Sequence, residues 1–308
     1  MGRRTIAGHK LTFNKQRKRE ELICPADLGN EGLWAIFARW AEDLMEEGLI
    51  QVGGQSFLRV KAVNRFSNHV VIVDTLSGKA GEEGVVYDAE SGESRLTLTE
   101  NDVPASSARA ILVSPPRGEV ALWFSEYSAR SSGASLLLDY FKKSWRNFDT
   151  GTTFNKDRLI ASEIALEKGL VTEVEVRTTR RSDDHSDGVV AKEGVVSHRF
   201  KPTKNKWISG AIIDVFRMDR SKAYDLVEIS APDAGDKSEI YVSVNVDGRT
   251  RKVEIFNPDD GVYFREELNA SNAPILSDLE IVDYCAGEAK TFLERNGCDW
   301  EESWAYRR

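Results

Sequence analysis

The sequence predicts an α+β fold with antiparallel sheets, hairpin connections, a few amphipathic helices and a closing C-terminal helix. Six strand-like segments between residues 57 and 125 are separated by short turn signals, as in an antiparallel meander rather than a β–α–β array. Helical periodicity is confined to separate stretches of the chain. The 308 residues are 41% hydrophobic and 30% charged, which is ordinary globular composition, and this length favours about two domains of ~150 residues.

Residues 1–150 predict an antiparallel β-rich domain with two helices. A weak alternation over residues 5–13 favours a first strand, and a helix follows Pro25 and stops at Gly48. The buried face of this helix is predicted from four apolar residues at helical spacing, Leu33, Phe37, Trp40 and Leu44. Three turn signals join the six strands into hairpins, Ser67-Asn68, Ser91-Gly92 and Pro115–Gly118. A second amphipathic helix is expected from about residue 132 to residue 148.

A polar, turn-rich stretch at residues 149–157 predicts the domain boundary, so that residues 151–308 form a second α+β domain. Its expected elements are strands at 170–177, 194–200 and 224–230, a helix at 208–218 and a hairpin at Asp247-Gly248. The final helix is the best specified element, because Ser277 and Glu280 have the spacing of a capping box and Gly297 supplies the stop. We expect this capped helix to close the second domain.

Charge is unevenly distributed along the chain. The formal net charge is −8 and the isoelectric point is near 5.3, which excludes a protein that coats nucleic acid over its whole surface. Residues 257–308 hold twelve acids and five bases, whereas residues 1–19 hold seven bases and no acid. The basic start is compatible with phosphate contact and equally with a solvated terminus.

The compartment is predicted from the cysteines and from the hydropathy pattern. Cys24, Cys285 and Cys298 are odd in number and widely spaced, so they predict neither a disulfide framework nor a CxxC metal site. No apolar run approaches the ~20 residues that a bilayer span needs, and the N-terminus has no apolar signal stretch. We therefore expect a cytoplasmic protein without a membrane partner.

The common catalytic motifs are missing from the sequence. It contains no GxxxxGK[ST], GxGxxG, HExxH or GxSxG pattern, and its four histidines lie in separate segments without a cysteine at metal-ligand spacing. The densest group of potential metal ligands, residues 182–188, is also what a polar hairpin tip contains. No catalytic residue can be named, and neither a metal nor another cofactor is expected.

Two basic segments are candidate nucleic-acid contacts. In the strand at residues 57–66 a period of two places three cations on one face, Arg59, Lys61 and Arg65, and apolar residues on the other, Leu58, Val60 and Ala62. Cations about 7 Å apart along a strand can follow a phosphate backbone, and Phe57 on their face can stack on a base. The same pattern also suits the solvated face of an antiparallel sheet.

The second basic segment, residues 196–207, contains cations, no acid and an aromatic at its end. Its candidate contacts are Arg199, Lys201, Lys204, Lys206 and Trp207, a combination that suits single-stranded nucleic acid or a solvated loop. A weaker candidate anion site lies at the start of the helix near residue 132. It would use Arg130, Ser131 and Ser132, although serine is also an ordinary helix cap.

The first hypothesis is therefore a non-enzymatic nucleic-acid-binding or nucleic-acid-associated accessory protein in a prokaryotic complex. Its partner would be nucleic acid, with a protein partner or a homo-oligomer also possible. The alternatives are a metal-dependent nuclease or phosphate-ester hydrolase without a recognisable motif, and a structural assembly subunit. Steeply salt-dependent oligonucleotide binding would favour the first hypothesis, and metal-dependent turnover would favour the second.

Overall fold

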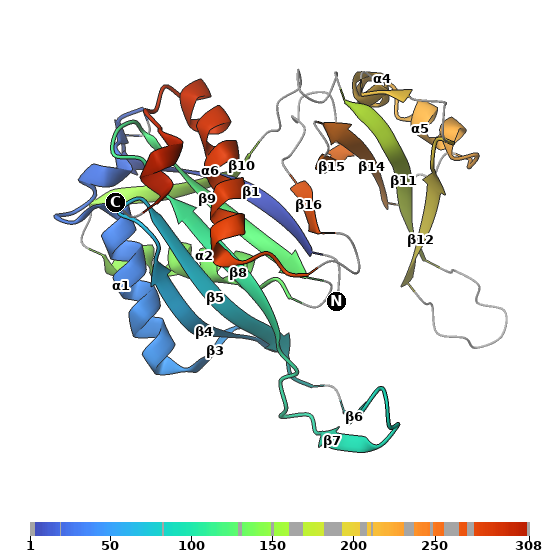
Figure 1. Ribbon diagram of the computed structural model, residues 1–308, viewed down its shortest axis with the longest axis horizontal. Helices are drawn as coiled ribbons and strands as arrows, with labels where there is room; N and C mark the ends of the chain where they lie inside the picture. Colours follow the sequence, from blue (N-terminus) through green and yellow to red (C-terminus); the bar gives the residue numbers. More distant parts are fainter. Residues whose placement is uncertain are drawn as a thin grey trace. The chain divides into compact units, whose positions relative to one another are not determined.

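The computed structural model (Figure 1) divides into two compact units, Met1–Arg158 with Leu268–Arg308, and Leu159–Glu267. We call them unit 1 and unit 2. The residues that the structure describes are 4–18, 20–81, 83–128, 131–148, 151–159, 169–181, 193–203, 208–210, 212–230, 237–246, 249–255, 265–269 and 274–306. Both units combine antiparallel strands with helices, which confirms the predicted α+β class.

Unit 1 is built on an antiparallel sheet whose central strands form a meander. Its strands follow one another across the sheet as β1 (Arg4–Lys15), β9 (Val120–Ser128), β8 (Ser106–Val113), β5 (Val70–Lys79), β4 (Ser56–Arg65) and β3 (Leu49–Gly53). Two further strands pair with β1, namely β2 (Leu22–Ile23) and β10 (Thr152–Arg158). The predicted β4–β5 and β8–β9 hairpins are confirmed, and the third predicted hairpin forms a separate sheet of β6 (Gly84–Tyr87) and β7 (Ser94–Leu98).

Helices cover both faces of this sheet because its central strands are apolar on both faces. Val71 and Val73 of β5 belong to the core beneath α1 (Gly32–Glu47) and α2 (Gly133–Ser144). The alternating residues Val70 and Ile72 are equally buried and therefore lie on the other face. There α6 (Asp278–Arg295) packs against β8 and β9, across which it is drawn in Figure 1.

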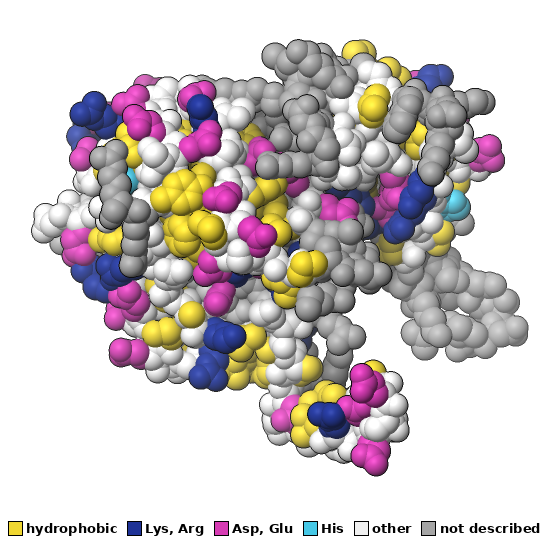
Figure 2. Space-filling model, viewed as in Figure 1, with side chains coloured by type: hydrophobic (Ala, Val, Ile, Leu, Met, Phe, Trp, Pro, Cys, Tyr) yellow, Lys and Arg dark blue, Asp and Glu magenta, His cyan; other side chains and the backbone are white. Residues whose placement is uncertain are grey.

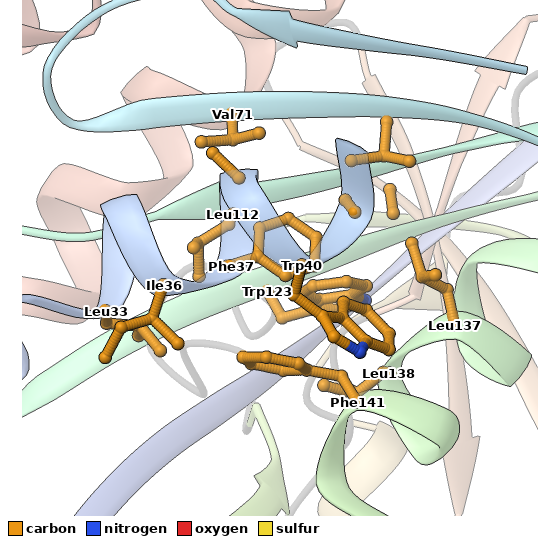
Figure 3. Close-up of a cluster of buried hydrophobic side chains, with 14 of the residues drawn as sticks. Leu33, Ile36, Phe37, Trp40, Val71, Leu112, Trp123, Leu137, Leu138 and Phe141 are labelled. Atoms are coloured by element: carbon orange, nitrogen blue, oxygen red, sulfur yellow. The ribbon is translucent and has the colours of Figure 1, made fainter. Parts of the chain in front are cut away.

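The core of unit 1 is rich in aromatic side chains (Figure 3). Phe37 of α1 lies 5.1 Å from the ring of Trp123 and 5.1 Å from that of Phe141, in edge-on arrangements. Edge-on pairs of this kind add about 0.5–1.5 kcal/mol to the burial of their area. All four residues of the predicted apolar stripe on α1 are buried, and the helix ends at Gly48 with a φ of 84°. The first helix is therefore confirmed.

The boundary expected near residue 150 differs from the division of the structure. Thr152–Arg158 form β10 and pair with β1, where Phe154 stacks on Phe13 at 4.9 Å. The capped helix α6 belongs to unit 1 and not to the second half of the chain, because its buried face packs on β8 and β9. The stretch at residues 149–157 suggested a boundary because it contains turn-forming residues. The β-branched and aromatic residues between them favour a strand, and a strand is what forms there.

Unit 2 combines antiparallel strands with two short helices. Four strands follow one another in the order β12 (Glu193–Phe200), β11 (Leu170–Arg181), β14 (Lys237–Val246) and β15 (Arg249–Ile255). Two short strands are added to them: β13 (Ile208–Ser209) pairs with β11, and β16 (Arg265–Asn269) pairs with β15. Helices α4 (Ile212–Met218) and α5 (Ser221–Leu226) contribute Phe216 and Ala223 to its core. The expected helix at 208–218 is thus β13 followed by α4.

The strand expected at residues 224–230 is wrong, because α5 occupies Ser221–Leu226. The carboxylate of Asp219 accepts hydrogen bonds from the backbone N–H of Ser221 at 3.0 Å and from its hydroxyl at 2.6 Å. These bonds satisfy donors at the start of the helix, and the consecutive residues Ala223 and Tyr224 are both buried. Burial of consecutive residues in the unit 2 core is typical of a helix and not of the strand that was expected here.

The predicted capping box of α6 is confirmed. Ser277 Oγ accepts from the N–H of Glu280 at 3.3 Å, and Glu280 Oε2 accepts from the N–H of Ser277 at 2.7 Å. Among the described helices, α6 included, none is both long enough and apolar enough to cross a membrane.

Replacing Ser277 with Ala should lower the free energy of unfolding by ~1 kcal/mol, because an N–H at the start of α6 loses its acceptor. Urea unfolding followed by tryptophan fluorescence measures this change, with Ser277→Thr as the control that keeps a hydroxyl cap. A loss below ~0.3 kcal/mol would mean that the box contributes nothing to stability.

Candidate functional site

The predicted basic stripe on β4 is broken by a β-bulge. The register between β4 and β5 shifts between Val60 and Ala62, so that Lys61 and Ala62 are both exposed. Beyond the bulge, Val63 packs against the core that buries Leu58 and Val60. A bulge moves every later residue to the opposite face of its strand. Arg65 therefore lies on the α1 side, and the prediction of three cations on one face is wrong.

The three cations of the stripe have different environments. Arg59 and Lys61 are exposed, and neither forms an ion pair with any other described residue. Arg65 donates Nε and NH2 to the two carboxylate oxygens of Glu42 on α1, both at 2.7 Å. Its guanidinium carbon also lies 5.3 Å from the ring centroid of Trp34. Arg65 is thus held in place by Glu42 and Trp34, whereas Arg59 and Lys61 are exposed surface charges.

Acids neutralise the described part of the second basic segment. In unit 2, Arg199 NH2 lies 3.1 Å from a carboxylate oxygen of Glu175, and Lys201 Nζ lies 3.1 Å from one of Glu173. Lys204, Lys206 and Trp207 are outside the described residues. The contacts observed for this segment are therefore internal to its own sheet.

The predicted anion site at the start of α2 is packed against the sheet. Arg130 lies outside the described residues, and the side chain of Ser132 makes no capping hydrogen bond. Ser131 is buried, with its Oγ 3.0 Å from that of Ser77 on β5. The first residue of α2, Gly133, lies so close to β5 that a Cβ built on it would be 2.3 Å from Thr75 Oγ1, which leaves no room for a side chain. This end of α2 is therefore covered by β5 rather than open to an anion.

A pocket of about 630 Å³ opens in unit 1 where α1, the β4–β5 turn and the C-terminal segment meet. Its wall consists of three large aromatic side chains, one histidine, one arginine and several small polar residues. They are Trp34, Arg65, Ser67, Asn68, His69, Ser303, Trp304 and Tyr306. Arg65 is thus a predicted site residue that the structure places in this pocket.

Two direct contacts position the C-terminal segment over the β4–β5 turn. The 3-10 helix η3 (Glu302–Ala305) presents the carbonyl of Trp304, which accepts a hydrogen bond from the hydroxyl of Ser67 at 2.8 Å. The hydroxyl of Ser67 in turn accepts from the N–H of His69 at 3.1 Å. The rings of His69 and Trp304 lie 5.7 Å apart. Hydrogen bonds and ring contacts thus fix the indole at the pocket wall.

Tyr306 completes the aromatic wall as a neutral side chain. Its hydroxyl donates to Asp283 on α6 at 2.5 Å, and its ring lies 6.4 Å from that of Phe66. Burial and the hydrogen bond to Asp283 raise the pKa of Tyr306 to about 12. The phenol therefore stays protonated at neutral pH, and the ring serves as an uncharged surface.

Two polar side chains that line the pocket, His69 and Asn68, are available to fix the orientation of a ligand. The carbonyl of Ser114 can only accept, so the Nδ1 of His69, 3.1 Å away, carries a proton and leaves Nε2 as an acceptor in the neutral ring. The indole N–H of Trp34 has no hydrogen-bond partner in the described part of the chain, but it is buried and does not face the pocket opening. The amide of Asn68 is exposed at the tip of the turn. Flat aromatic walls with a few donors and acceptors are suited to holding a planar heterocycle.

The described residues contain no group of three or more His, Cys, Asp and Glu side chains that could hold a metal ion.

Sequence reasoning missed the pocket because its parts lie far apart in the chain. A signal was present near residue 300, where Trp300, Trp304 and Tyr306 fall within seven residues without forming an amphipathic pattern. Aromatic side chains concentrated outside a periodic element are enriched at binding surfaces.

Comparison of this chain with protein-family models, with curated proteins and with solved structures found no match.

Proposed function

We propose that this protein is a non-enzymatic nucleic-acid-binding protein that holds one unstacked base of a single strand in the aromatic pocket. The observation that supports this function is the meeting of Trp34, Trp304 and Tyr306 around a cavity of about 630 Å³. Single-stranded nucleic acid is commonly bound by stacking of splayed-out bases on aromatic side chains. The pocket is therefore assigned to a base and not to the phosphate backbone.

Each pocket residue has a role in this proposal. The base stacks on Trp304 beside Tyr306, and Trp34, whose ring already contacts the guanidinium of Arg65, borders it. Asn68 supplies a donor and an acceptor for a base edge. Arg65 is already paired with Glu42, so it stiffens the wall by its contact with Trp34 rather than binding phosphate. Arg59 and Lys61 remain possible phosphate contacts on the other side of β4.

The charge balance predicts how binding responds to salt. Stacking releases few counterions, whereas each phosphate contact contributes ~0.7–0.9 to the slope of log K against log salt. The acidic chain and the paired Arg65 therefore predict a shallow slope, about 2 or less if Arg59 and Lys61 both contribute.

Fluorescence anisotropy with end-labelled dT, dA and rU oligonucleotides tests the proposal. We expect Trp304→Ala to weaken binding about 5- to 150-fold, because loss of one base–aromatic stack costs ~1–3 kcal/mol. Trp304→Phe, which keeps a ring, should retain most of the affinity. Tyr87→Ala removes an aromatic that is 63% exposed on the β6–β7 hairpin and is the matched control.

Two results would contradict the proposal. One is equal affinity of wild type and Trp304→Ala when circular dichroism shows that both are folded. The other is a failure of the wild type to bind any of the three oligonucleotides at low salt, which would favour the assembly hypothesis.

A further inference from the structure

The hairpin of β6 and β7 is a two-stranded sheet that leaves the meander between β5 and β8 (Figure 1). Its register pairs Gly84 with Leu98 and Val86 with Leu96. In the described chain neither strand has a neighbour on its outer edge. Two strands alone are marginally stable in water, and an open edge is a template for a further strand.

Large apolar side chains are exposed on this hairpin. Val85 and Val86 are each 43% exposed, Leu96 is 55% exposed and Tyr87 is 63% exposed. Val86 and Leu96 lie directly opposite one another, so they share one face. Figure 2 shows the hairpin with hydrophobic side chains beside several acidic ones. Apolar patches with a polar rim are typical of protein interaction sites.

The hairpin is held in shape at both ends. At the turn, Asp88 Oδ1 accepts from the N–H groups of Glu90 and Ser91, both at 2.9 Å, and Gly92 has a φ of 72°. At the base, the N–H of Gly81 donates to the carbonyl of Glu100 at 2.8 Å. A preorganised surface loses little conformational entropy when a partner binds.

Charge identifies the chemistry of the partner. Residues 80–103 hold seven acids and one base, Arg95, and therefore carry −6 of the net −8 of the chain. Arg95 is itself paired with Asp88. Such a surface repels a second copy of itself and the phosphates of nucleic acid, whereas it attracts a cationic polypeptide.

We infer that the β6–β7 hairpin binds an extended, cationic segment of another protein by strand addition. The open edge supplies main-chain hydrogen bonds, and the face with Val86 and Leu96 receives the apolar side chains of the added strand. The acidic residues of the hairpin pair with its lysines or arginines. This surface lies on different elements from the aromatic pocket, so the two proposals fail independently.

The probe is a fluorescein-labelled peptide of about nine alternating lysine and valine residues, the length of a long strand. We expect it to bind the full chain and to slow hydrogen exchange of amides in β6 or β7. Val86→Ser with Leu96→Ser should weaken binding about tenfold or more, although the charge is unchanged. Glu83→Gln with Glu90→Gln and Glu93→Gln should weaken it and reduce its salt dependence.

The matched control is Met45→Ser with Leu279→Ser, two other exposed apolar side chains of unit 1, and it should bind like wild type. Three results would overturn the inference. The first is that the variant with Val86→Ser and Leu96→Ser binds the lysine–valine peptide as well as wild type does. The second is that wild type binds a glutamate–valine peptide equally well. The third is that wild type sediments as a dimer and this variant does not. The last result would identify a second copy as the partner. Unchanged exchange rates in the rest of unit 1 show that each variant is folded.

Discussion

Glu126→Gln should lower the free energy of unfolding of unit 1 by about 3–5 kcal/mol, because it leaves buried arginines without a counter-charge. The side chain of Glu126 is completely buried on β9. It accepts from the N–H, Nε and NH2 of Arg109 at 3.0–3.1 Å, and Arg4 NH1 lies 3.0 Å from it. Gln keeps the volume but removes the charge that both guanidinium groups require.

Urea unfolding followed by tryptophan fluorescence measures this loss, since six of the seven tryptophans belong to unit 1. The control is Glu31→Gln, which removes an exposed carboxylate paired with Arg39 and should leave stability almost unchanged. A loss below ~1 kcal/mol for Glu126→Gln would show that the second ion pair of Arg109, with Asp278, suffices.

Glu175→Gln should destabilise unit 2 by about 1–3 kcal/mol, less than Glu126→Gln does in unit 1, because Arg177 and Arg199 are partly exposed to water. Glu175 is 1% exposed on β11, and it bonds to Arg177 at 3.1 Å, to Arg199 at 3.1 Å and to Lys252. Burial alone would raise the pKa of this carboxyl, but Lys252 and Arg177 outweigh it and lower the pKa to about 2. Three cations around one buried carboxylate would remain unbalanced in the variant.

The pH dependence gives this prediction a second readout. The folded pKa of Glu175 is below its ordinary value of 4.5, so its stabilisation is complete above pH 4.5 and is lost as the pH falls toward about 2. Hydrogen exchange of β11 and β14 amides at several pH values measures it. The variant should lose this acid dependence, whereas Glu239→Gln, an exposed change on β14, should keep it. Identical acid profiles for wild type and Glu175→Gln would contradict the assignment.

Local patterns in the sequence predicted the elements of unit 1 well. Turn residues at Ser67-Asn68 mark a real hairpin, and the apolar spacing of α1 marks its buried face. These features depend on neighbours in the chain, so periodicity and turn chemistry suffice to find them. The Ser277 capping box belongs to the same class.

Features that depend on distant contacts were not predicted. The bulge after Val60 depends on pairing with β5 and carries no local signal, yet it moves Arg65 from the expected stripe to the pocket. The pocket itself requires α6 and the C-terminal segment to pack on unit 1, which the expected boundary near residue 150 excluded. An aromatic such as Trp304 acquires its role only through that packing.

The most direct test of the aromatic pocket is photo-cross-linking with an oligonucleotide that carries 5-iodouracil, followed by mass spectrometry of the cross-linked peptides. A halogenated base reacts with the aromatic ring on which it stacks. The cross-links should therefore map to Trp34, Trp304 or Tyr306. In the Trp304→Phe variant the cross-linking yield should decrease by the same factor as the affinity for the oligonucleotide. Cross-links confined to β4 around Arg59 and Lys61, or to unit 2, would contradict the assignment of base binding to this pocket.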